Sequence, residues 1–191
     1  LQMAGAGKDR EILMKSSWDN ARSRLPWLFA SWVGGVCAAA IIGIFDNTLQ
    51  STLALAAFIP VVIGMGGNIG TQTSTLVVRG LATGRVNVGN NINIIFKEIR
   101  VGLILGILYG LLLGLFAIMS FVDISPYLGL VVGLGIACSM LIATAFGSLV
   151  PLLLHRMDID PAIATGPFVT TSIDILGVTL YFVIAKIFLP V

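Results

Sequence analysis

Five long stretches, four without a charged side chain and one with a single charge, limit what this chain can fold into. They cover residues 25–45, 47–78, 101–122, 124–154 and 161–185. The last stretch alone contains a charge, Asp174. A helix needs about twenty apolar residues to cross the hydrocarbon core of a bilayer. Since only 10% of the 191 residues are charged and 57% are hydrophobic, we expect an all-α membrane protein with five transmembrane helices.

The second stretch is longer than one straight span requires. It carries Pro60, followed by Gly64, Gly66, Gly67 and Gly70. Proline and clustered glycines bend or interrupt helices. Irregular backbone at membrane depth is tolerated only where protein or a water-filled cavity satisfies the exposed amide groups. We therefore expect the second helix to be kinked or broken and to face the protein interior.

Two amphipathic segments lie outside these spans, one before the first span and one between the second and the third. We expect residues 1–24 to lie at the membrane surface and to lead into the first span at Pro26, and residues 25–191 to form the transmembrane pore domain. Residues 85–100 mix apolar and polar side chains over a length too short to cross, which predicts an interfacial or re-entrant helix.

The lysines and arginines predict the orientation of the chain. They lie before the first span, between the second and third, and after the fourth, whereas the turns at Asp46 and Asp123 contain none. Cytoplasmic loops are enriched in these residues. We expect a multi-pass protein of the inner or plasma membrane with its N-terminus in the cytoplasm and its C-terminus outside. Lys186 lies on the opposite side, at a span end where its side chain can reach the interface.

Asp174 is the one carboxylate deep inside a span. Placing such a charge at a helix centre costs about 2.5–3.5 kcal/mol, so the group needs a partner, a proton or water. Counting by three and four places Pro167, Thr170, Thr171 and Gly177 near the same helix face. Because no basic residue lies within a span, a bound cation is the natural partner. A buried aspartate that fastens helices through hydrogen bonds is the alternative.

The second span offers another polar face. Asn68, Gln72 and Thr75 follow the glycine cluster at helical spacing. These amides either join helices by hydrogen bonds or face a pore, and both roles are compatible with the pattern. We predict metal ligands at Asp174, Thr170 and Thr171. The predicted pore-lining residues are Asn68, Gln72, Gly67, Pro167 and Gly177.

The ligand types favour a hard cation. Magnesium keeps several waters and is held by one or two carboxylates, and no Cys or His accompanies Asp174 to favour a soft metal. In a two-fold dimer with the last span on the axis, two copies of Asp174 would match a divalent charge. No catalytic motif stands in a credible context, and a net charge of +2 does not point to nucleic acid. We expect no enzyme.

Several motifs resemble the MgtE magnesium channel/transporter family. Residues 60–73 read PVVIGMGGNIGTQT and residues 79–84 read RGLATG, which resemble the signature of the family's second span. Residues 22–28, RSRLPWL, resemble its entry to the first span. Residues 160–174 resemble its last span through the pairs DP, GP and TT and the final aspartate. The resemblance covers nearly the whole chain.

This resemblance implies a homodimeric channel with five spans per subunit. Its second and fifth spans would line a pore that conducts Mg²⁺ into the cytoplasm, and the family's pore carboxylate carries over to Asp174. Full-length members carry a cytosolic acidic domain and paired CBS modules that close the pore when internal Mg²⁺ is high. We expect that regulatory domain to be absent from this chain and residues 1–24 to be the tail of its connecting helix.

Two questions stay open at the level of sequence. A proton- or sodium-coupled cation carrier in which Asp174 titrates is the alternative to a Mg²⁺ pathway. Other divalent cations are also compatible with the residue types, because selectivity depends on pore width and dimer geometry.

Overall fold

The computed structural model describes residues 16–86, 91–122, 125, 127–161 and 166–189. The helices are α2 (Ser17–Ile44), α3 (Asp46–Ser51), α4 (Ala54–Ala82), α5 (Asn91–Ser120), α6 (Tyr127–Arg156) and α7 (Pro167–Phe188). The described residues contain no strand. Five of these helices, all except α3, are long and apolar enough to cross a membrane. The prediction of an all-α protein with five candidate spans is confirmed.

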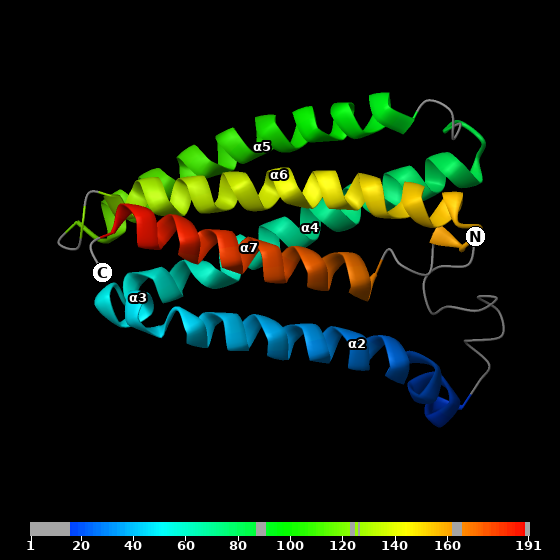
Figure 1. Cartoon of the computed structure of the whole chain (residues 1–191), viewed down its shortest axis with the longest axis horizontal. Helices are drawn as coiled ribbons and strands as arrows, with labels where there is room; N and C mark the ends of the chain where they lie inside the picture. The colour runs from blue at the N-terminus through cyan, green and yellow to red at the C-terminus, as the bar shows by residue number, and fades with distance from the viewer. Residues whose placement is uncertain (1–15, 87–90, 123–124, 126, 162–165, 190–191) are drawn as a thin grey trace.

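The long helices run side by side as one bundle (Figure 1). Helix α6 packs against α4, α5 and α7, and α2 packs mainly against α7. The starts of α2, α5 and α7 lie at the same end of the bundle as the ends of α4 and α6 (Figure 1). That end is basic. It carries Arg22, Arg24, Arg79, Arg85, Lys97, Arg100 and Arg156.

Helix α2 begins earlier than its apolar stretch. The side chain of Ser16 caps it by accepting a hydrogen bond from the backbone N–H of Asp19 at 3.3 Å. The helix then continues without interruption through Pro26, so the expectation that this proline lies in the first turn of a helix is wrong, although the candidate span does begin close to it, at Arg24. The serine cap, rather than the proline, starts the helix. Residues 1–15 of the expected surface segment lie outside the described residues.

The second charge-free stretch forms two helical pieces. Helix α3 ends at Ser51, Thr52 and Leu53 form a turn, and α4 follows. The interruption therefore precedes Pro60, and α4 is continuous through this proline and the glycine cluster. A bend at Pro60 stays a prediction.

Helix α5 also begins earlier than expected. Residues 91–100 form its first turns and run directly into the span, so the separate interfacial or re-entrant helix is wrong for this part; residues 87–90 lie outside the described residues. Neither proline nor glycine separates Asn91 from Val101, so nothing stops the helix there. The hydroxyl of Thr73 on α4 donates to a carboxylate oxygen of Glu98 at 3.1 Å, which fastens these turns to α4.

Glycines bring α5 and α6 into backbone contact. A Cβ atom added at Gly110 would lie 2.7 Å from the carbonyl oxygen of Gly133, and one at Gly114 would lie 2.7 Å from that of Gly129. Close approach of this kind is typical of small residues in membrane helices. The α5–α6 pair therefore depends on the absence of side chains at these positions.

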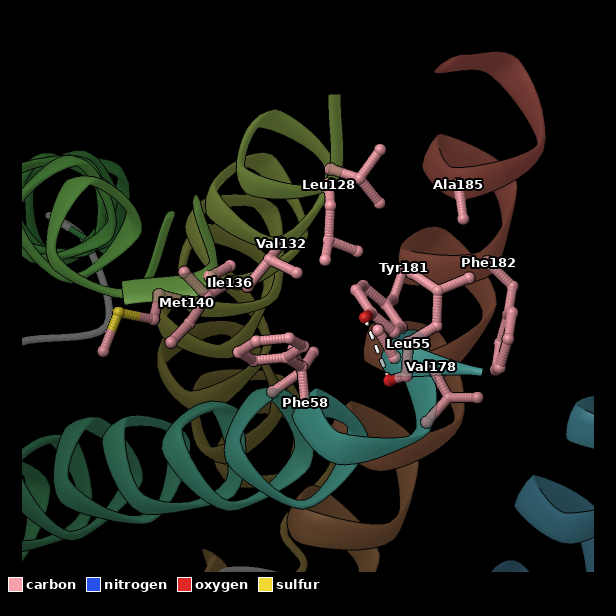
Figure 2. Packing of buried hydrophobic residues seen from close by; sticks show 14 of the residues in the cluster. Leu55, Phe58, Leu128, Val132, Ile136, Met140, Val178, Tyr181, Phe182 and Ala185 are labelled. Atoms are coloured by element: carbon pink, nitrogen blue, oxygen red, sulfur yellow. Dashed lines mark hydrogen bonds between the residues drawn. The ribbon is translucent and has the colours of Figure 1, made fainter. Parts of the chain in front are cut away.

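The largest buried side chains gather where α4, α6 and α7 meet. Figure 2 shows Tyr181 and Phe182 of α7 beside Leu55 and Phe58 of α4. The phenol of Tyr181 is fully buried and donates a hydrogen bond to the carbonyl oxygen of Leu55 at 3.1 Å. This contact lies two helical turns from Asp174 along α7. It anchors the helix that carries the candidate site.

Candidate functional site

Asp174 lies about two turns from the start of α7 and beside Gly67 of α4. The helix begins at Pro167, after Gly166, and the aspartate is half-buried. A Cβ atom added at Gly67 of α4 would lie 3.6 Å from Oδ1 of Asp174. Within the described part of the chain the carboxylate has no hydrogen bond or ion pair. The predicted alternative, an aspartate that fastens helices through hydrogen bonds, therefore has no partner in this part.

The residue before Asp174 fixes its position. The side chain of Ile173 is buried in a notch on α4 made by Gly66 and Gly70. A Cβ atom at Gly70 would clash with Ile173, whereas one at Gly66 would clash with the Ser139 hydroxyl and lie 3.2 Å from Ile173. Because successive residues of a helix are rotated by about 100°, seating Ile173 in the notch directs Asp174 toward the edge of α4.

Ser139 of α6 completes this junction. Its hydroxyl is buried, donates to the carbonyl oxygen of Val62 at 3.2 Å and lies 2.9 Å from where a Cβ of Gly177 would be. Three helices thus meet at small residues. The sequence analysis did not single out Ile173 or Ser139. The spacing of Gly66 and Gly70, a small-xxx-small pattern, is the signal that points to such a junction.

The two predicted threonine ligands flank Asp174 on different sides. The hydroxyl of Thr170 donates to the carbonyl oxygens of Gly166 at 3.2 Å and Pro167 at 3.3 Å. The side chain of Thr171 packs against Gly34 of α2. Asp174 therefore lies between the sides of α7 that face α4 and α2. The Pro167 carbonyl already accepts a hydrogen bond from Thr170.

Helix α4 carries an exposed polar stripe beside this point. Asn68, Gln72 and Thr75 are exposed in the single chain. Gly67 directly precedes Asn68 of this stripe, and a Cβ atom added at Gly67 would come within van der Waals distance of Asp174. Gly177, in contrast, is buried against α6. The structure thus brings Asp174, Gly67 and the polar stripe to one region and directs Gly177 elsewhere.

The ligand set is sparse. The described residues contain no group of three or more His, Cys, Asp or Glu side chains that could hold a metal ion. A site with one carboxylate per chain cannot replace the hydration shell of a divalent cation. It suits an ion that keeps its waters.

Comparisons with known proteins agree on one family. A family model described as MgtE, divalent cation transporter, matches residues 59–184. The chain is 36% identical over 188 residues to the magnesium transporter MgtE of Bacillus subtilis (strain 168), covering 98% of this chain and 41% of the relative. It is 35% identical over 187 residues to that of Enterococcus faecalis, covering 96% and 40%.

A third relative is the magnesium transporter MgtE of Thermus thermophilus, 34% identical over 168 residues, with 87% of this chain and 36% of the relative covered. The chain spans about two fifths of the length of these curated relatives.

Proposed function

The chain belongs to the MgtE family of divalent cation transporters, and from this premise we propose that it carries Mg²⁺ across the membrane into the cytoplasm. The observation that supports this proposal most directly is the carboxylate of Asp174. It lies inside a candidate span against Gly67 and has no protein partner among the described residues. A charge in that position needs a cation or water.

Asp174 would bind the ion through water. A hydrated Mg²⁺ presents its waters as hydrogen-bond donors, and a carboxylate accepts them while it compensates the charge. The exposed amides of Asn68 and Gln72 on the neighbouring stripe offer further partners to the same waters. The missing side chain at Gly67 leaves room for this shell next to Oδ1.

Two subunits would form the pathway. The polar stripe of α4 is exposed in the single chain, and contact with lipid hydrocarbon would leave its amides without partners. A second copy placed across a two-fold axis would enclose the stripe around water and bring a second Asp174 to the ion. Two carboxylates match the charge of a divalent cation. In this homodimer α4 and α7 line the pore, and the N-terminus lies in the cytoplasm.

The test is Mg²⁺ uptake into proteoliposomes that contain an internal Mg²⁺ indicator. Asp174→Asn keeps the side-chain shape and removes the charge, and we expect uptake to fall by about tenfold or more, since each 1.4 kcal/mol of lost stabilisation is a factor of ten. The matched control is Asp46→Asn, which removes an exposed carboxylate at the start of α3. Uptake by Asp174→Asn at the rate of the control would contradict the site.

The same vesicles separate a Mg²⁺ pathway from a coupled carrier. We expect uptake to persist when pH and Na⁺ gradients are abolished by ionophores and the membrane potential is held constant. Uptake that stops under these conditions would favour the carrier in which Asp174 titrates.

A further inference from the structure

A small groove lies between the start of α5 and the end of α6, at the basic end of the bundle. Its volume is about 130 Å³. The lining residues are Ile92, Ile95, Leu149, Leu152, Leu153 and Arg156. Five aliphatic side chains and one guanidinium therefore form a surface that is apolar along its length and positively charged at one end.

Arg156 gives the groove its polarity. It is the last residue of α6, is exposed and makes no ion pair with a described residue. Asp158, two residues further on, is exposed in the turn and does not pair with it. The guanidinium is therefore free to bind an anion, and its planar donors match two phosphate oxygens.

The position of the groove identifies the kind of anion. Leu149 and Leu153 lie within the last two turns of a helix long enough to span the membrane, and Arg156 ends that helix. The groove thus lies at one end of the two candidate spans formed by α5 and α6, the end that carries the basic residues. A ligand that fits both the aliphatic walls and the arginine has an acyl chain and an anionic head group. Basic pockets between membrane helices recognise such lipids.

A second groove on the same helix pair provides a comparison. It has a volume of about 380 Å³, runs along Gly110 and Gly114 of α5 and Gly133 of α6, and has no charged residue in its lining. Nothing in it distinguishes one lipid from another. Of these two grooves, the one at Arg156 combines aliphatic walls with an arginine.

We propose that this groove binds one anionic phospholipid per chain, with its phosphate on Arg156 and an acyl chain along Leu149, Leu153 and Ile92. The site is separate from Asp174. Its test measures binding rather than transport, so it can fail or succeed independently of the proposed function.

The test uses native mass spectrometry of the delipidated chain in detergent. It is titrated with phosphatidylglycerol and, in parallel, with phosphatidylcholine of identical acyl chains. We expect one phosphatidylglycerol per chain to bind more tightly than the rest, and Arg156→Gln to weaken that first binding by about tenfold, as the loss of a charge-assisted hydrogen bond implies. Arg85→Gln is the matched control, because it removes one exposed positive charge at the same end without touching the groove.

A second pair of variants tests the acyl chain. Leu153→Trp fills the groove and should abolish the first binding event, whereas Leu108→Trp, on the exposed surface of α5 outside the lining, should leave it unchanged. An excess of glycerol phosphate should not displace the lipid.

Equal affinity for the two lipids would overturn the proposal, as would equal losses in Arg156→Gln and Arg85→Gln. Displacement by glycerol phosphate would show that the arginine binds a free phosphate rather than a lipid.

Discussion

The substitution Gly67→Ala should have opposite effects on two measured quantities: it should raise the free energy of unfolding and slow Mg²⁺ uptake. The added Cβ atom would lie 3.6 Å from Oδ1 of Asp174, an ordinary van der Waals distance, and meets no other atom that close. No neighbour has to move. Because alanine is a better helix former than glycine, the change should raise the free energy of unfolding by up to about 1 kcal/mol.

The same methyl group should slow Mg²⁺ uptake. It occupies the space on the α4 side of Oδ1 where a water of the hydrated ion would donate to the carboxylate. A hydrogen bond to a charged group contributes about 1.5–3 kcal/mol. At 1.4 kcal/mol per factor of ten, losing one such contact predicts uptake that is about ten- to hundredfold slower.

Uptake is measured in proteoliposomes and stability by thermal unfolding in detergent. Gly35→Ala is the control, since Gly35 lies on α2 with no atom within 4 Å of the added Cβ, and it should gain stability without losing uptake. If Gly67→Ala transports Mg²⁺ at the rate of Gly35→Ala while keeping its fold, the carboxylate beside Gly67 does not contact the ion's hydration shell. If it unfolds at a lower temperature, the geometry at Asp174 is wrong.

Three further changes test the packing. Gly110→Ala should destabilise the chain by about 1–3 kcal/mol, because its Cβ would meet a carbonyl oxygen at 2.7 Å, whereas Gly43→Ala, which meets nothing within 4 Å, should not lower the melting temperature. Tyr181→Phe should cost about 0.6–1.7 kcal/mol through one lost hydrogen bond in the membrane and leave uptake intact. Thr73→Val should lower the melting temperature because Glu98 loses its donor, and an unchanged melting temperature would show that this bond does not hold α5 to α4.

The number and order of the spans could be predicted because lipid penalises charge at every position of a helix. Charge-free stretches therefore identified all five long helices. Their starts could not be predicted in this way, because a helix begins where it is capped rather than where hydrocarbon begins. Ser16 starts α2 well ahead of Pro26, and α5 begins at Asn91 although Lys97 and Glu98 follow.

The site was predicted only in part. Asp174 stands out because a lone carboxylate in a span is expensive. Counting three and four residues along the helix from Asp174 selects residues on the same side of α7. This count does not show which neighbouring helix each of those residues packs against. Gly177 and Thr171 are near Asp174 along α7, yet the first packs against α6 and the second against α2. Which helix each residue faces depends on tertiary packing, and here the seating of Ile173 in the glycine notch of α4 sets the rotation of α7.

The attachment of α2 has a mechanical consequence. This helix packs mainly against α7, and Gly34 contacts Thr171, one turn from Asp174. A movement of α2 is therefore transmitted to the rest of the bundle mainly through α7, the helix that carries Asp174. A displacement of α2 would therefore act first on α7 near Thr171, one turn from Asp174, and would be opposed by the packing of α7 against α4 and α6.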